Sequence, residues 1–418
     1  MKKNLLTLSL AIAFVSIKSQ VIIDTVSVGP AYANQVWYSL ANDNQGSASK
    51  SNWDLAFDCS GQGSTIHINS VTGTTLWQYP GADTTGWNTL DTAGINSWSK
   101  RWNSDTSWAM GAMGRYASLS NPNDLDWGVY SSITHVVTGD SLYVIKLANG
   151  AYKKLHIRTL SGGTYNFRYA DLGGANLQNA TLTKSVYAGQ NFGYYSIQNN
   201  AVLSREPLSA NWDLLFTQYT AYIPTPYTVT GVLQNKGVKV AKVKPVANAN
   251  SYVSWSAHTF KTAINVIGYD WKAFGTGWTI EDSLVYFVQS KPGAIWKVIP
   301  TGFGGSANGN NIFSKEMLSA VGIKEANGNN IATMVVYPNP SDGNNVSLIL
   351  STEEVIQDPL LRLYDGNGRM VRETHLNSTK NDQLNVFQID THDLENGIYM
   401  LSLSINGKTA NQKLIITK

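Results

Sequence analysis

The chain has 418 residues, of which 43% are hydrophobic and only 14% are charged, and its net charge is +3 at pH 7. This length exceeds one ordinary core, and the hydrophobic content excludes a wholly disordered protein. The small charge, without a long basic run, gives no indication of nucleic-acid binding. Tyr (21) and Trp (13) are abundant, which favours short strands joined by polar turns. We therefore predict an all-β protein.

The N-terminus has the pattern of an export signal. Lys2 and Lys3 precede an apolar run over residues 5–15, and small and polar residues follow. This predicts a secretory signal peptide over residues 1–19. The run is too short to span a bilayer, and no long apolar segment follows, so we predict no membrane span. Cys59 is the only cysteine, so an internal disulfide is excluded and we expect a structural thiol.

A repeated hexapeptide indicates a duplicated domain. Asn-Trp-Asp opens both residues 52–57 and residues 211–216. Four more pairs occur in the same order: 36–40 with 193–197, 126–127 with 270–271, 140–145 with 282–287, and 150–155 with 293–298. We predict two tandem antiparallel β domains, over residues 20–185 and 186–320. We expect the repeated Trp to anchor the core, and Asp54 and Asp213 to accept backbone hydrogen bonds at strand ends.

Each predicted copy contains a hairpin. Residues 142–145 form an apolar strand, Asn149-Gly150 supplies a turn and residues 152–157 return. In the second copy the turn is Pro292-Gly293. Residues 164–169 alternate aromatic and polar side chains, which predicts a strand with one buried face.

A Gly-, Asn- and Ala-rich segment predicts a linker over residues 321–334. Beyond it, four motifs occur in order: Tyr337-Pro338-Asn339-Pro340, Asp365-Gly366-Asn367-Gly368-Arg369, Gly397-Ile398-Tyr399, and Lys413-Leu414-Ile415-Ile416-Thr417-Lys418. Residues 335–418 thereby resemble the type A C-terminal sorting domain of the Bacteroidetes type IX secretion system. The residues themselves predict a small, immunoglobulin-like β-sandwich. The resemblance implies export by the type IX machinery, followed by release or by attachment to surface lipopolysaccharide. We therefore predict a secreted or cell-surface protein.

The order of motifs in residues 22–185 resembles that of the HmuY family of secreted, all-β haem-binding proteins, and residues 186–320 resemble a more divergent copy. The motifs that carry the resemblance are Asn52-Trp53-Asp54, the strand and turn over 143–155, and the aromatic strand over 165–169. Haem-binding members of that family hold the iron with His or Met side chains from loops, and these ligands lie outside the shared motifs. Haem is therefore a cofactor to be sought among the His and Met residues of this chain.

Candidate haem ligands are Met110 and Met113 in a Gly-rich loop, His135, and His258 in the second copy. No histidine aligns between the copies, which weakens a shared metal function. His67 and His156 each lie between two aliphatic residues, and strand alternation places them on the opposite face, so we expect both to face solvent.

Enzyme motifs are absent from the sequence: it contains no His-Glu-x-x-His, Gly-x-Ser-x-Gly or Cys-x-x-Cys. We predict no catalytic residues and no metal site, although a carboxylate pair for glycoside hydrolysis stays open. The sequence favours an exported, non-enzymatic binding protein for haem or a related tetrapyrrole. The alternatives are an adhesin or glycan-binding protein that uses its Trp and Tyr, and a secreted hydrolase with an unrecognised site.

Overall fold

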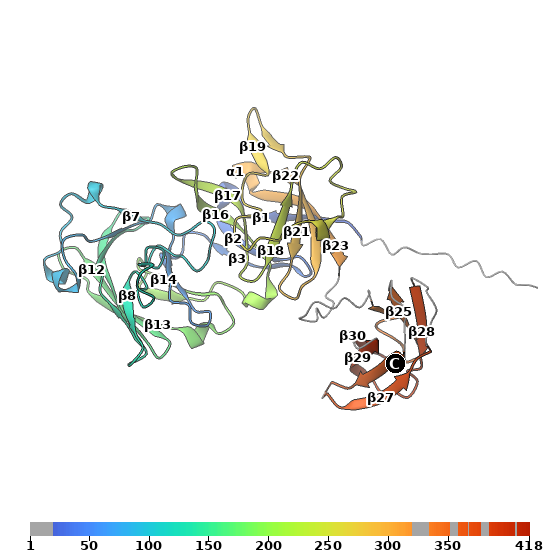
Figure 1. The fold of residues 1–418 in the computed structure, drawn as a ribbon. Helices are drawn as coiled ribbons and strands as arrows, with labels where there is room; N and C mark the ends of the chain where they lie inside the picture. Colours follow the sequence, from blue (N-terminus) through green and yellow to red (C-terminus); the bar gives the residue numbers. More distant parts are fainter. Residues whose placement is uncertain (1–19, 320–333, 352–357, 367, 378–383, 406–407) are drawn as a thin grey trace, which may run out of the picture. The chain divides into compact units, whose positions relative to one another are not determined.

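The computed structural model describes residues 20–319, 334–351, 358–366, 368–377, 384–405 and 408–418. The chain divides into two compact units, an N-terminal unit up to residue 320 and a C-terminal unit from residue 321 (Figure 1). Strands dominate both units, which confirms the predicted all-β class. The predicted signal peptide over 1–19, and the predicted linker apart from Met334, lie outside the described residues.

The first lobe of the N-terminal unit is a sandwich of two antiparallel sheets. In the larger sheet the neighbours run in the order β13 (Gln178–Thr183), β12 (Thr164–Asp171), β11 (Tyr152–Ser161), β10 (Tyr143–Lys146), β6 (Thr75–Gln78) and β7 (Lys100–Arg101), with β9 (Val136–Gly139) on β11 and β8 (Gly128–Ser131) on β9. The smaller sheet has the order β15 (Ala201–Leu203), β14 (Phe192–Ser196), β4 (Leu55–Asp58) and β5 (Ile66–Ile68). Phe57, Tyr143 and Phe167 are among the fully buried side chains packed between the two sheets.

The second lobe repeats this arrangement. Its larger sheet has the order β1 (Ile22–Ser27), β23 (Asn310–Ser319), β22 (Ile295–Phe303), β21 (Val285–Gln289) and β18 (Lys239–Val243). Its smaller sheet has the order β17 (Pro226–Gln234), β16 (Leu214–Tyr222), β2 (Asn34–Ser39) and β3 (Asp43–Ser49). A separate hairpin joins β19 (Lys272–Phe274) to β20 (Trp278–Ile280). Tyr38, Phe216 and Tyr286 lie in the core between the larger and the smaller sheet of this lobe.

Short helical segments connect the strands. Among the described residues the α-helix is α1 (Gly305–Asn308). The 3-10 turns are η1 (Pro30–Tyr32), η2 (Ser70–Thr72), η3 (Thr84–Asn88), η4 (Ile95–Ser97), η5 (Lys184–Tyr187), η6 (Ser209–Asn211) and η7 (Trp255–Ala257).

The two lobes exchange strands. β2, from the first predicted copy, pairs with β16 in the second lobe, whereas β14, from the second predicted copy, pairs with β4 in the first lobe. β1 also joins the second lobe, through its pairing with β23. Figure 1 shows the blue strands β1, β2 and β3 beside β16 and β17, which follow much later in the chain. Residues 22–49 thus complete the second lobe, and residues 192–203 complete the first.

The repeated Asn-Trp-Asp segments occupy equivalent positions in these lobes. The backbone N–H of Asp54 donates to the carbonyl of Tyr195 at 2.9 Å, and that of Asp213 donates to the carbonyl of Tyr38 at 2.8 Å. The side-chain Nδ2 of Asn69 donates to Trp53 O at 2.8 Å. Asn235 Nδ2 donates to Trp212 O at 2.7 Å, the corresponding bond of the second lobe.

The carboxylates of the two motifs act as predicted. Asp213 Oδ2 accepts the backbone N–H of Leu40 at 2.9 Å. Asp54 Oδ2 accepts the backbone N–H of Gln198 at 3.2 Å. In both lobes the carboxylate satisfies a backbone donor just beyond the exchanged strand, which fixes the end of that strand against the motif.

The predicted hairpins are confirmed. β10 pairs with β11 and β21 pairs with β22, and both turns contain a glycine with positive φ, Gly150 at +87° and Gly293 at +106°. That backbone conformation is open to glycine at little cost. Side chains along β12 alternate between buried and partly exposed over most of the strand, in agreement with its one buried face.

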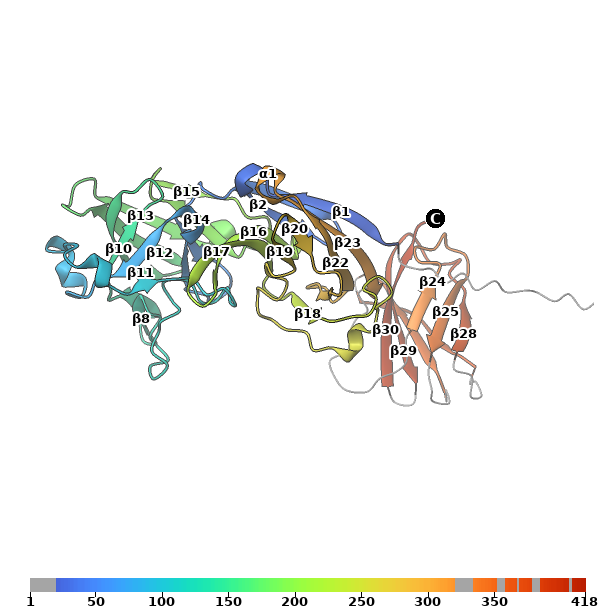
Figure 2. The same cartoon turned by 90° about the horizontal axis from the view of Figure 1, so that it is seen from above.

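The C-terminal unit is a small sandwich of antiparallel sheets, shown again in Figure 2. One described sheet contains β24 (Met334–Tyr337), β25 (Val346–Ser351) and β28 (Leu384–Ile389). The other contains β27 (Met370–His375), β26 (Leu360–Tyr364), β29 (Gly397–Ile405) and β30 (Lys408–Ile416). Leu348, Leu363 and Leu401 are buried in the common core. The expected β-sandwich is therefore present.

Candidate functional site

A cavity of the N-terminal unit lies where the two smaller sheets face each other. Each of these sheets packs one face on the core of its own lobe, through residues such as Leu55 and Leu214. The alternate residues point to the opposite face, as strand geometry requires. Ala56 and Leu215, the next residues along the two strands, line a cavity of about 90 Å³ between the lobes.

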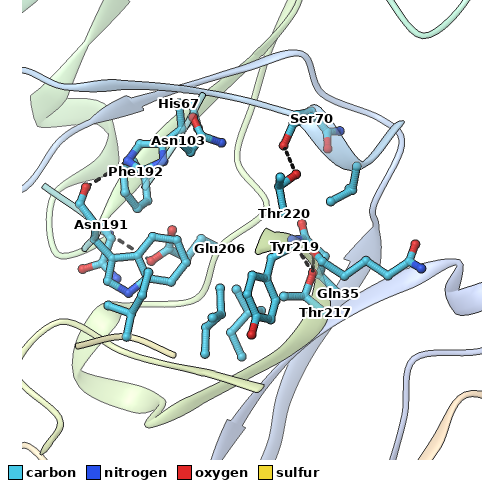
Figure 3. Close-up of a pocket in the computed structure, with 18 of the residues that line it drawn as sticks. Gln35, His67, Ser70, Asn103, Asn191, Phe192, Glu206, Thr217, Tyr219 and Thr220 are labelled. Carbon is cyan, nitrogen blue, oxygen red and sulfur yellow. Dashed lines mark hydrogen bonds between the residues drawn. The ribbon is translucent and has the colours of Figure 1, made fainter. Parts of the chain in front are cut away.

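Aromatic side chains form much of the cavity wall: Trp37, Trp53, Trp108, Phe192, Tyr194, Trp212 and Tyr219. Polar side chains lie among them, including Gln35, His67, Asn69, Asn103, Asp105, Asn191, Glu206 and Thr217. Figure 3 shows this mixture, with His67, Phe192 and Glu206 on one side and Tyr219 and Thr220 on the other. Cavities with largely aromatic walls and a few polar groups are typical of small-ligand sites.

Both repeated Trp residues belong to this wall. Trp53 is 9% exposed and Trp212 is 2% exposed, which agrees with the expected buried anchors. Both also line the cavity, a role that the core interpretation did not include. Within the described chain, the indole Nε1 of each has no hydrogen-bond partner, and neither has the Tyr219 hydroxyl or Asn69 Oδ1. Buried polar groups are rarely left without a hydrogen-bond partner, so these four atoms are an unusual feature of the residues around the cavity.

His67 is buried in the cavity wall, not exposed to solvent as predicted. Only 5% of the residue is exposed, and His156 is 7% exposed, so both predictions of solvent-facing histidines were wrong. Alternation did place His67 on the face opposite Ile66 and Ile68, but Trp108 and Phe192 cover that face. The outer face of the sheet that contains His156 is likewise covered, by a cluster that includes Trp87.

Burial makes His67 a neutral base. Its Nε2 lies 2.9 Å from the carbonyl oxygen of Trp108, which can only accept, so Nε2 carries the hydrogen and Nδ1 is the acceptor. Burial lowers the pKa of His67 to about 4. Its ring also packs edge-on against Phe192 at 5.0 Å. His67 is therefore neutral in the folded protein at physiological pH.

Glu206 is a buried acid in the same wall, with 3% of the residue exposed. Its Oε1 accepts the backbone N–H of Asn191 at 3.1 Å, and its Oε2 lies 3.1 Å from the Tyr194 hydroxyl. Burial outweighs these bonds and raises the pKa of Glu206 to about 7. A substantial fraction of Glu206 is thus protonated at neutral pH, and the cavity favours ligands of low charge.

A cation supports the aromatic wall from behind. The Arg205 guanidinium lies 5.5 Å from the ring of Trp37, 5.7 Å from that of Trp53 and 4.9 Å from that of Tyr194. It also donates to Gln35 Oε1 at 2.5 Å. Arg205 thereby connects strands of the two lobes and orients the rings that line the cavity.

The four predicted haem ligands have four different surroundings. Met113 is fully buried in the core of the first lobe, whereas Met110 is 48% exposed on the preceding loop. His135 Nδ1 lies 2.8 Å from the Tyr130 hydroxyl, and His258 Nε2 lies 2.7 Å from the hydroxyl of Tyr252. None of the four lines the cavity. The described residues contain no group of three or more His, Cys, Asp or Glu side chains arranged to hold a metal ion.

Comparison with known proteins identifies the C-terminal unit. Residues 335–417 match the family described as a secretion system C-terminal sorting domain. This confirms the predicted sorting domain, and with it export by the type IX secretion system to the cell surface or the medium. No curated protein matches the chain. In the part of the chain that the structure describes, no helix is both long and apolar enough to cross a membrane.

Proposed function

We propose that the mature protein is a non-enzymatic binding protein that captures an extracellular glycan through the cavity between its two lobes. The observation that carries this proposal is the aromatic wall with amide and hydroxyl side chains among its rings. Flat aromatic rings complement the C–H faces of sugar rings, and amide, hydroxyl and indole groups complement sugar hydroxyls. Burial favours the neutral forms of His67 and Glu206, because it lowers the pKa of the first and raises that of the second, and this supports a ligand of low charge.

The size of the cavity supports the capture of an end group, not of a whole drug-sized molecule. The space of about 90 Å³ is smaller than the cavity of about 150 Å³ that takes up benzene in another protein. A hydroxymethyl or acetamido group of a terminal sugar matches this space. A tetrapyrrole does not fit it without movement of the walls.

A glycan array probed with the full mature chain tests the proposal, followed by titration of the best saccharide. Trp212→Phe keeps an aromatic side chain but reduces the ring surface available to a sugar in the cavity, so we expect affinity to fall by up to about tenfold. Trp271→Phe is the matched control, because Trp271 is equally buried with an unpartnered Nε1 but does not line the cavity. Equal affinity of both variants, or no saccharide bound, would contradict the proposal.

A second candidate function is glycoside hydrolysis, favoured by one observation. Glu206 and Asp105 line the same cavity, and Glu206 has the raised pKa that a general acid needs. In such a reaction Glu206 would give its proton to the leaving oxygen while the second carboxylate assists on the other side of the sugar. Release of nitrophenol from aryl glycosides by the wild type, and its loss in Glu206→Gln, would replace the binding proposal with this one.

Haem binding by HmuY-like domains remains a prediction from sequence resemblance. The scattered surroundings of Met110, Met113, His135 and His258 favour the glycan proposal over it. A haemin titration tests the prediction, and a saturable Soret shift that Met113→Ala or His135→Ala weakens would support haem. Attachment of the mature protein to lipopolysaccharide is likewise a proposal that rests on the sorting domain alone.

A further inference from the structure

A second hollow adjoins the cavity on the surface of the N-terminal unit. This groove has a volume of about 650 Å³, and its polar lining includes Asp58, Ser60, Thr106, Ser107, Asn235 and Lys236. Trp108 and Ile264 line both the groove and the cavity, so the two spaces lie on either side of these side chains.

Trp108 is held in a fixed orientation at this junction. Its indole Nε1 donates to the carbonyl oxygen of Gln234 at 2.8 Å. Its ring centroid lies 6.1 Å from that of His67 and 5.8 Å from that of Phe192. Trp108 comes from the long segment between β7 and β8, which has no helix or regular strand, and segments of this length in compact domains are often binding loops. A rigid aromatic side chain between two hollows is suited to stacking against a ligand that occupies both.

The charges of the groove are paired within it. Lys236 Nζ lies 3.0 Å from each carboxylate oxygen of Asp58 and donates to Ser60 Oγ at 2.7 Å. The Asp58 side chain is 4% exposed, whereas that of Lys236 is 25% exposed. A closed ion pair surrounded by hydroxyl and amide groups offers donors and acceptors without net charge. This lining matches a neutral, hydroxyl-rich molecule.

We propose that the ligand is an oligosaccharide whose terminal sugar inserts an end group into the cavity while the following sugars lie in the groove along Trp108. The groove volume falls within the roughly 300–1,000 Å³ that ligand sites occupy, whereas the cavity alone is too small. The inference rests on the proposed glycan binding and extends it, since it makes chain length the basis of selectivity.

A chain-length series tests the inference with the full mature protein. Affinities are measured by calorimetry for the mono-, di- and trisaccharide of the sugar that the array identifies. We expect the trisaccharide to bind at least about tenfold more tightly than the monosaccharide, the equivalent of one or two additional hydrogen bonds. Ala109→Trp and Thr262→Trp fill the groove from exposed positions in its lining. Both should remove the gain with chain length and leave the affinity for the monosaccharide unchanged.

Ala257→Trp is the control, because Ala257 is exposed and lies outside both the groove and the cavity. This variant should retain the full increase in affinity from the monosaccharide to the trisaccharide. Equal affinity for all three saccharides, or a gain that survives in both groove variants, would overturn the inference and leave the cavity proposal intact. Absence of binding by every saccharide would instead refute the glycan proposal itself.

Discussion

Replacing Glu206 with Gln should change how the stability of the N-terminal unit depends on pH. Burial raises the pKa of Glu206 from 4.5 to about 7. Between these values the folded state keeps a proton that the unfolded state has lost, so stability falls as pH rises, by ~1.4 kcal/mol per pH unit. The total loss is about 3 kcal/mol and is complete above about pH 7. Gln stays neutral and can keep both bonds, to Asn191 N and the Tyr194 hydroxyl. The stability of the variant relative to the wild type should therefore rise by about 3 kcal/mol from pH 4.5 to pH 7.

His67, in the same cavity wall, changes the pH dependence of folding stability in the opposite direction. Burial lowers its pKa from 6.5 to about 4, so the unfolded state binds a proton that the folded state lacks. Its contribution to stability is lost as pH falls through this interval, also by about 3 kcal/mol. In the wild type the two slopes oppose each other between about pH 4.5 and 6.5. His67→Gln, which keeps a donor for Trp108 O, should expose the falling slope of Glu206, and Glu206→Gln should expose the rising slope of His67.

Urea unfolding of the full chain at pH 5, 6, 7 and 8 measures these slopes. All 13 Trp residues precede residue 320, so Trp fluorescence reports only the N-terminal unit. The difference between each variant and the wild type cancels the contributions of other titrating groups. A difference for Glu206→Gln that stays constant within about 0.5 kcal/mol from pH 5 to pH 8 would refute the buried acid, since that interval covers most of the expected change.

Three further outcomes follow from the structure. Met113→Ala should lower the free energy of unfolding by about 2–5 kcal/mol, because Met113 is buried in the core. Met110 is exposed, so Met110→Ala should change that free energy by less than about 0.5 kcal/mol. Equal effects of the two variants in urea unfolding would contradict the assignment of Met113 to the core. Asn69→Ala and Asn235→Ala should each lower the free energy of unfolding by about 1–3 kcal/mol, because each removes the side-chain donor to the carbonyl oxygen of the motif Trp, Trp53 or Trp212. A variant that unfolds at the same urea concentration as the wild type would contradict this role of the amide. Deletion of residues 335–418 should retain the protein in the periplasm, as cell fractionation would show, and unchanged amounts at the surface and in the medium would contradict the sorting role.

The local elements were predictable from the sequence because short-range rules determine them. Asn149-Gly150 predicts its hairpin through turn geometry, and Asp213 predicts its backbone bond because an acid next to a strand end has few other nearby partners. The C-terminal motifs likewise predict the sorting domain, since they combine in a fixed order. None of these inferences required knowledge of distant parts of the chain.

The exchange of strands was not predictable, because the two copies carry equivalent patterns. β2 and β14 have similar aromatic sequences, so either could pair with β4 or with β16 by local criteria. The choice depends on loop lengths and on packing between lobes, which no single segment encodes. The burial of His67 depends on the exchanged strand β14, which supplies Phe192, and on Trp108 from a distant loop. Glu206 lies outside the repeated motifs, and no signal in the sequence points to it.

The exchanged strands also determine the order in which the N-terminal unit can fold. A hydrogen bond between Asn311 and Val26 joins residues 285 positions apart. β1 and β2 are synthesised first, yet their partners β23 and β16 belong to the later part of the unit. The last strand of the first lobe ends at residue 203, so that lobe can form before synthesis of the chain is complete. The second lobe lacks β23 until residue 319 has been synthesised. Such non-local pairing slows folding and leaves apolar strand edges unpaired for a long time. We therefore expect slow refolding of the second lobe and dependence on chaperones before export.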